Sequence, residues 1–170
     1  MKETIESLDY FWRVRCAACQ TLSRVANSMP NPDSGKDALL NIFKTYFCLS
    51  DTVSTDRILR RNDFSNFQQY FVQCELPSAL ARIRMPSGMT PHGISKFIES
   101  LIRYNDNSKN AYLDCYWKAT LVEALANTLS RGVQGNLSRD AVFLHPPNFC
   151  TTFNPLNDFS VRRSSYHFKA

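Results

Sequence analysis

The sequence predicts an all-α fold, an α-solenoid in which antiparallel pairs of helices stack side by side. Three observations lead to this prediction. An aromatic and basic phrase opens two segments, at residues 11–18 (FWRVRCAA) and 116–121 (YWKATL). Apolar residues recur at i, i+3, i+4 and i+7 within these segments and those between them, which is the period of an amphipathic helix. Short polar turns separate the segments, so each helix must bury its apolar stripe against a neighbour, as in HEAT and armadillo arrays.

The composition fits one globular domain. The 170 residues are 44% hydrophobic and 21% charged, enough to build a core. The net charge of +5 is compatible with an acidic partner or nucleic acid, but a solvated surface is the simpler interpretation. No run approaches the roughly 18 apolar residues of a membrane span. We therefore expect a soluble, intracellular protein with no membrane partner.

The first two helices are expected to form an antiparallel pair. The first extends from about Ile5 to Asn27 and ends at the proline-containing turn 30–33, because proline cannot continue a helix. The second follows residues 34–36. The expected apolar face of the first helix is Val14, Ala17, Ala18, Leu22 and Val25, and that of the second is Leu39, Ile42, Phe43, Tyr46 and Phe47.

The third helix is expected after a surface connection at residues 49–62, which lose the helical period and hold one helical turn at most. Asn62 or Asp63 would cap it. Its stripe is aromatic: Phe64, Phe67, Tyr70, Phe71 and Cys74. A bend or break is expected near Pro77, followed by a shorter segment, 78–84, with Leu80 and Ile83 facing inward.

Two further helices complete the array. The fourth is expected to begin at Thr90 and Pro91, since a hydroxyl cap followed by proline favours a helix start. The fifth follows the polar stretch 104–110 and ends at Arg131 and Gly132. The expected faces are Ile94, Phe97, Ile98, Leu101 and Ile102 in the fourth helix, and Trp117, Leu121, Ala124, Leu125 and Leu129 in the fifth.

These elements predict a helical-repeat domain of about five helices over residues 1–132 and an irregular tail over 133–170. The tail loses the helical period and contains two dipeptides typical of turns, Pro146–Pro147 and Asn154–Pro155. Disorder and an incorrectly spliced or truncated end are alternative interpretations. Its aromatic residues are expected to dock on the exposed end of the solenoid or on another chain: Phe143, Phe149, Phe153, Phe159, Tyr166 and Phe168.

The sequence contains no pattern typical of an active site. The three histidines lie far apart, and none belongs to a two-histidine zinc motif. Cys16 and Cys19 have the spacing of a metal or redox pair but lack a second ligand pair or a preceding strand. We therefore expect the six cysteines to be structural thiols. No glycine-rich phosphate loop is present, and we predict no enzyme activity, no catalytic residue, no cofactor and no metal.

The basic residues are the remaining candidates for contact with a partner. We expect Arg13, Arg15 and Lys118 to pair with acidic residues or to cap carbonyls between repeats, with a partner-binding ridge as the alternative. The candidates for partner or phosphate contact are Arg57, Arg60, Arg61, Arg162 and Arg163. They lack the aromatic interleaving of single-strand binders, so a solvated loop is the alternative interpretation.

Four phrases together resemble one family. They are residues 10–18 (YFWRVRCAA) with 25–27 (VAN), 62–71 (NDFSNFQQYF), 102–110 (IRYNDNSKN), and 116–119 (YWKA) with 121–127 (LVEALAN). In this order and spacing they are similar to the TBP-associated factor 2 family of the general transcription factor IID (TFIID). The resemblance covers residues from about 8 to 130. The family's proteins look like zinc aminopeptidases that have lost the metal site, and this stretch is similar to the helical repeats beyond that core.

The resemblance implies a non-catalytic scaffold in the nucleus. Such a fragment would support core-promoter (initiator) recognition and assembly of the RNA polymerase II pre-initiation complex. Its implied partners are TATA-binding protein and the associated factors, with core-promoter DNA contacted directly or through the complex. The alternatives are the C-terminal helical domain of an active M1-type zinc aminopeptidase and a generic intracellular HEAT-repeat adaptor.

Overall fold

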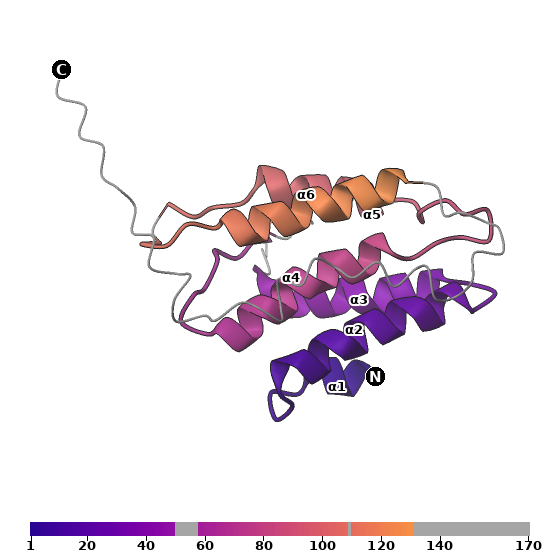
Figure 1. Ribbon diagram of the computed structural model, residues 1–170, viewed down its shortest axis with the longest axis horizontal. Coiled ribbons are helices and arrows are strands. Elements are labelled where there is room, and N and C mark those ends of the chain that lie inside the picture. The colour runs from indigo at the N-terminus through magenta and orange to yellow at the C-terminus, as the bar shows by residue number, and fades with distance from the viewer. Residues whose placement is uncertain (50–57, 109, 131–170) are drawn as a thin grey trace, which may run out of the picture.

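The computed structural model describes residues 1–49, 58–108 and 110–130. In these residues helices follow one another with a single short strand pair between them (Figure 1). The elements are α1 (Lys2–Glu6), α2 (Trp12–Asn27), α3 (Asp33–Phe47), β1 (Cys48–Leu49), β2 (Ile58–Leu59), α4 (Phe67–Ala81), α5 (Ile94–Arg103) and α6 (Cys115–Leu129). None of the described helices has the length and apolarity needed to cross a membrane.

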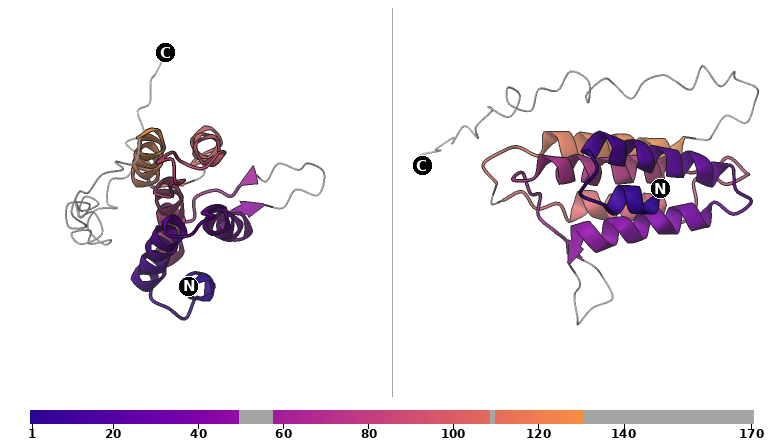
Figure 2. Two further views of the ribbon diagram at one scale, coloured as in Figure 1. Left: turned by 90° about the vertical axis from the view of Figure 1, so that its right-hand side faces the viewer. Right: turned by 90° about the horizontal axis from the view of Figure 1, so that it is seen from below.

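The helices form two layers, seen end-on in Figure 2. One layer contains α2, α4 and α6 side by side, and the other contains α3 and α5. The chain runs up one helix of the first layer and returns along a helix of the second, so that α2 with α3 and α4 with α5 are antiparallel pairs. This arrangement confirms the predicted all-α helical-repeat fold.

Helix α4 is the centre of the array because it contacts α2, α3, α5 and α6. Ten of its fifteen residues are buried, Pro77 among them. The expected break at Pro77 was wrong, since α4 continues through it to Ala81. Proline removes one helical hydrogen bond, but burial of apolar side chains on all sides of α4 holds its backbone in place. Leu80 and Ile83 are buried, as predicted.

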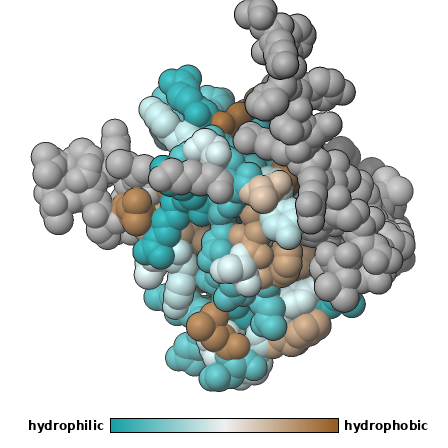
Figure 3. All heavy atoms as spheres, turned by 90° about the vertical axis from the view of Figure 1, so that its left-hand side faces the viewer, coloured by the Kyte–Doolittle hydropathy of each residue, from teal (hydrophilic) through white to brown (hydrophobic). Residues whose placement is uncertain are grey.

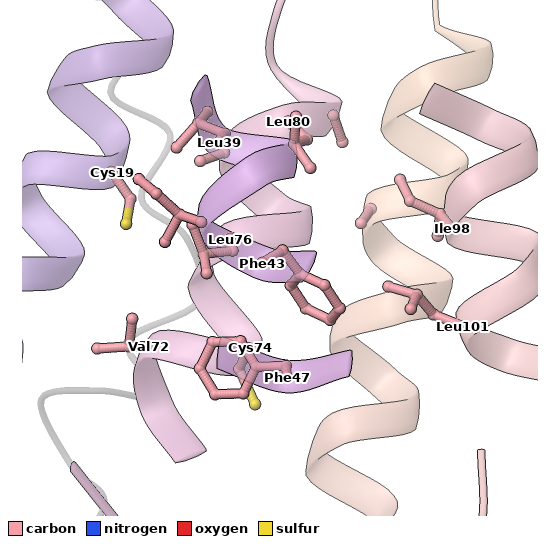
Figure 4. Packing of buried hydrophobic residues seen from close by; sticks show 14 of the residues in the cluster. Cys19, Leu39, Phe43, Phe47, Val72, Cys74, Leu76, Leu80, Ile98 and Leu101 are labelled. Carbon is pink, nitrogen blue, oxygen red and sulfur yellow. The ribbon is translucent and has the colours of Figure 1, made fainter. Parts of the chain in front are cut away.

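The core runs continuously from one helical pair to the next. Figure 4 shows the buried cluster extending from Cys19 and Leu76 through Phe43 to Ile98 and Leu101. The Phe43 ring of α3 lies 5.3 Å from Phe97 of α5 and 6.5 Å from Trp117 of α6, between ring centroids. Each helical pair therefore buries its apolar stripe against its neighbours.

The first helix differs from the prediction because it is divided. Ser7 is extended (φ −69°, ψ 129°), and its hydroxyl accepts a hydrogen bond from the Asp9 amide at 3.2 Å, a local bond that competes with the helix. Helix α1 then folds back on α2, where the Arg15 Nε donates to the Ile5 carbonyl at 2.8 Å. Burial of Ile5 and of the Arg15 side chain fixes this turn.

The buried face of α2 is rotated from the predicted one. Ala18 is buried as expected, but Val14 and Ala17 are exposed, while Arg15 and Cys19 are buried. An arginine does not ordinarily define an apolar face. The hydrogen bond from Arg15 to the Ile5 carbonyl of α1 accounts for the burial of the Arg15 side of α2. Toward the outer ends of α5 and α6, Ile102 is 37% and Leu129 is 77% exposed, so these two expected core positions were also wrong.

The helix starts also needed correction. Asn66, and neither Asn62 nor Asp63, caps α4, because its Oδ1 accepts from the Gln69 amide at 3.0 Å. Helix α5 begins after Gly93, at Ile94. The start expected at residues 90–91 was wrong because the Thr90 hydroxyl instead donates to the Thr128 carbonyl of α6 at 3.0 Å.

The connection predicted over residues 49–62 contains the β1–β2 pair, in which Cys48 lies opposite Leu59 in an antiparallel ladder. The Arg60 amide extends the ladder by donating to the Phe47 carbonyl at 2.8 Å. Helix α6 ends at Leu129, and Ser130 after it is extended. The helix end expected at 131–132 and the tail 133–170 lie outside the described residues.

Candidate partner-binding end of the helical array

Helices α2, α4 and α6 all begin at the same end of the molecule, on the left in Figure 1. Aromatic side chains link these three helix starts. The rings of Trp12 and Phe71 are stacked at 4.5 Å between centroids, and Phe71 meets Tyr116 edge-on at 6.1 Å. The Phe64 ring lies 5.0 Å from Tyr70 in the same region. We call this region the aromatic end.

Large apolar side chains remain exposed around the aromatic end. Figure 3 views the molecule from this side and shows apolar residues interspersed with hydrophilic ones. The exposed members are Leu8 (67%), Tyr10 (49%), Phe11 (55%), Tyr112 (41%) and Leu113 (43%). Exposed aromatic residues fixed on a rigid base are typical of protein contact sites.

A polar network supports the loops at this end. The buried Asn62 side chain donates to the Asn105 Oδ1 at 3.2 Å, and its carbonyl accepts from Asn110 at 3.0 Å. Gln73 of α4 donates to the Asn62 Oδ1 at 3.4 Å, while Asn105 bonds to Asp114 at the start of α6. The network joins the segment before α4 to the loop before α6, and satisfied buried networks of this kind rigidify their surroundings.

An ion pair lies at the surface beside this network, between Arg61 and Asp106, which are the sequence neighbours of Asn62 and Asn105. The Arg61 Nε lies 2.8 Å from the Asp106 Oδ2. Hydrogen bonds from the Ser108 hydroxyl and amide, followed by those from Arg61, lower the pKa of Asp106 to about 2. Asp106 is therefore ionised at neutral pH, and the Arg61 side chain remains 51% exposed beside it.

The predicted contact arginines do not gather into one described cluster. Arg60 is exposed, and its Nε donates to the Cys48 carbonyl at 3.1 Å, whereas Arg61 belongs to the ion pair at the rim of the aromatic end. Arg57, Arg162 and Arg163 lie outside the described residues.

The other basic residues have internal contacts. Arg15 caps the Ile5 carbonyl of α1, in agreement with the predicted capping role. Lys118 pairs with an acidic residue, Asp114, at 3.1 Å, but this contact lies within the start of α6 and not between repeats. The Arg13 guanidinium lies 5.2 Å from the centroid of the Trp12 ring, a cation–π distance.

At the opposite end of the array, Arg84 joins the ends of three helices. Its Nη1 donates to the Ala81 carbonyl at 2.6 Å and to the Ile83 carbonyl at 2.9 Å. Its Nη2 donates to the Asn127 carbonyl of α6 at 2.7 Å, and its amide donates to the Asn27 Oδ1 of α2 at 2.8 Å. This clamp fixes the layer formed by α2, α4 and α6.

Within the described residues, no group of three or more His, Cys, Asp or Glu side chains is placed to hold a metal ion. Cys19, Cys48 and Cys74 are buried thiols, and Cys115 is an exposed one. Burial raises the pKa of Cys19 to about 12, which makes its thiolate scarce at neutral pH. The burial of Cys19, Cys48 and Cys74 fits the structural role predicted for them, whereas the exposed Cys115 does not have this burial.

The whole described part of the chain lies within one family match. Residues 1–143 match the family described as TAF2-like, TPR repeats. The chain belongs to this family. The helical repeats of this family are described as tetratricopeptide (TPR) repeats.

Relatives from distant eukaryotes agree with this assignment. The chain is 44% identical over 130 residues to a protein of Drosophila melanogaster, covering 76% of the chain and 10% of the relative. It is 38% identical over 136 residues to one of Gallus gallus (80% and 11%) and 34% identical over 114 residues to one of Saccharomyces cerevisiae (67% and 8%). All three are named "Transcription initiation factor TFIID subunit 2". The chain thus spans about a tenth of the length of these relatives.

The sequence reasoning missed the aromatic end as a site. One part of each phrase of the family resemblance meets there, namely 10–18, 62–71, 102–110 and 116–119, through Trp12, Phe71, Tyr116 and the Asn62–Asn105 bond. The remaining parts, 25–27 and 121–127, reach the Arg84 clamp at the opposite end. The available signal was the polar stretch 105–110, with asparagine at 105, 107 and 110, because asparagine side chains in a turn commonly bond to backbone or to each other.

Proposed function

We propose that this TAF2-like chain is a non-catalytic scaffold segment of a TFIID subunit in the nucleus, binding other TFIID subunits. Its proposed role is to support core-promoter (initiator) recognition and assembly of the RNA polymerase II pre-initiation complex. The name printed for the relatives supports this assignment. The structural observation that supports it is that residues from all four family phrases, Trp12, Phe71, Asn105 and Tyr116 among them, lie together at the aromatic end.

The aromatic end has the properties of a protein contact site. Tyr10 and Phe11 are about half exposed, and Phe11 lies 5.6 Å from the Trp12 ring, which is in turn stacked on α4. Because aromatic side chains on a fixed base lose little conformational entropy on binding, they commonly supply most of an interface's energy. We propose this surface as the contact for TATA-binding protein or an associated factor.

The test is affinity purification of the tagged chain from nuclear extract, with mass spectrometry of the recovered proteins. The chain with Tyr10→Ala and Phe11→Ala is compared with wild type, and Met89→Ala, an exposed apolar position on the α4–α5 connection, is the matched control. We expect recovery of TFIID subunits with wild type and control, and at least a tenfold loss with the double variant. Equal recovery with all three would exclude the aromatic end as the contact, and recovery of no TFIID subunit with the wild-type chain would contradict the proposed scaffold role.

We also propose contact with core-promoter DNA, directly or through the complex, with Arg57, Arg60, Arg61, Arg162 and Arg163 as the candidate phosphate contacts. Arg61 supports the proposal because half of its side chain is accessible beside its ion pair. Replacing Arg60 and Arg61 with glutamine should weaken DNA binding and reduce its salt dependence by about one unit of slope per lost phosphate contact. A binding curve unchanged by both salt and substitution would rule out direct contact.

A further inference from the structure

Helix α6 carries apolar residues on two opposite sides. One side, with Trp117, Leu121 and Ala124, is fully buried against α4 and α5. The other side is exposed along the whole helix. We call it the outer stripe, and its members are Cys115, Ala119, Val122, Ala126 and Leu129. Val122 is 60% and Leu129 is 77% exposed.

The outer stripe has the spacing of a helix-packing seam. Its members follow one another at intervals of four, three, four and three residues, which places them in one row along the helix. Alanine at positions 119 and 126 allows a second helix to approach closely. Lys118 and Glu123 flank the stripe on its two sides. A helix that is apolar on two sides is ordinarily buried on both, as α4 is in this molecule.

The order of the helices indicates which segment belongs on this surface. In each of the first two pairs, a helix of the α2–α4–α6 layer is followed by an antiparallel helix that packs beside it, α3 after α2 and α5 after α4. Helix α6 begins a third such pair. The described residues end at Ser130, directly after the stripe residue Leu129, and 131–170 follow.

We propose that the segment following α6, residues 131–170, packs back along the outer stripe as the second member of the third helical pair. The tail as a whole loses the helical period, but its first part, before Pro146, keeps a short row: Leu137, Ala141 and Leu144 have the i, i+4, i+7 spacing of an apolar helical row. The family match continues through residue 143, which includes most of this row. Helix α6 is about 22 Å long, and forty residues are ample for a turn and a return along it.

A second copy of the chain fits the stripe less well. A contact along one helix about 22 Å long and about 10 Å wide covers on the order of 200–300 Å² on each partner. Stable complexes between separate molecules bury about 800 Å² per partner. A tethered segment avoids most of the entropy cost of association, because its effective concentration reaches the millimolar range. The small area of the stripe therefore favours a segment of the same chain.

The test is photo-crosslinking in the full-length chain with a benzophenone amino acid placed at Val122, and at Met89 as the control. Mass spectrometry identifies the crosslinked peptides. We expect crosslinks from position 122 to residues 131–170 within one molecule, at least fivefold more abundant than from position 89. Crosslinks to another copy, or no excess over the control, would overturn the proposal.

A second measurement does not depend on the photoreactive residue. Limited proteolysis of the full chain is compared between wild type, Val122→Asp and the control Met89→Asp, with circular dichroism to verify that each is folded. Because a carboxylate in the stripe opposes apolar packing, we expect Val122→Asp to accelerate cleavage within 131–170 at least fivefold and Met89→Asp to leave it unchanged. Equal cleavage rates for folded wild type and Val122→Asp would contradict the proposal.

Discussion

Gly35 sets the distance between α2 and α3. It is buried in the first turn of α3, facing Ala26 of α2, which is 1% exposed. A methyl group added at Gly35 would lie 3.4 Å from the Ala26 Cα and 3.9 Å from the Leu22 carbonyl oxygen. It would lie far inside van der Waals contact with the Ala26 Cβ. Neither backbone nor a methyl group can rotate away, so Gly35→Ala must force the two helices apart.

The expected magnitude follows from two opposing effects. Overpacking a well-packed contact costs about 1–3 kcal/mol, while alanine gains up to about 1 kcal/mol over glycine in helix propensity, and less near a helix end. We expect Gly35→Ala to lower the free energy of unfolding by about 1–2 kcal/mol. Each kcal/mol corresponds to a fall in Tm of about 2–4 °C for a chain of this size.

Urea denaturation of a double-mutant cycle measures the contact itself. Ala26→Gly removes the opposing methyl group, so the variant carrying both changes should recover most of the packing cost. The coupling free energy between the two positions is expected to be about 1–3 kcal/mol and favourable. If Gly35→Ala is as stable as wild type, or if the two changes are additive, the close approach of α2 and α3 is not as described.

Four further predictions concern stability. Ala18→Leu should lower the free energy of unfolding by about 1–3 kcal/mol because Ala18 is buried. Ala17→Leu should change the free energy of unfolding by less than about 0.5 kcal/mol because Ala17 is exposed. Equal effects of the two variants in urea denaturation would contradict the rotated buried face of α2. Arg84→Ala should cost roughly 2 kcal/mol, since it removes charged donors to the carbonyls of α4 and α6, and an unchanged Tm would argue against the clamp. Hydrogen bonds from Ser108, and then from Arg61, lower the pKa of Asp106 from 3.8 to about 2. The ionised Asp106 therefore stabilises the folded state above pH 4, and this contribution is lost as the pH falls through 2. The Asp106→Asn variant should lose less stability over this pH interval than wild type, as followed by circular dichroism. Burial raises the pKa of Glu75 above 4.5, so ionisation costs stability as the pH rises through the raised pKa, and Glu75→Gln should be more stable than wild type at pH 8 but not at pH 4.

Local sequence determined the type and approximate position of most helices. The faces predicted for residues 39–47 and 94–101 agree with the structure, because a 3.6-residue apolar period has one arrangement that buries its stripe. The aromatic starts of α2 and α6 were also evident, since both phrases are continuous in the chain. The sequence did not reveal that parts of all four family phrases meet at one end, because that depends on contacts between residues far apart in the chain.

Tertiary contacts decided the features that contradicted local rules. Proline ordinarily ends a helix, but α4 continues through Pro77 because it is packed on all sides. Arginine ordinarily faces solvent, but Arg15 is buried because α1 folds back to offer a carbonyl. Thr90 is a good helix cap by type, but its hydroxyl bonds to α6 instead. In each case the sequence specified a local preference worth about 1–3 kcal/mol, and packing against another helix supplied a larger or competing contribution.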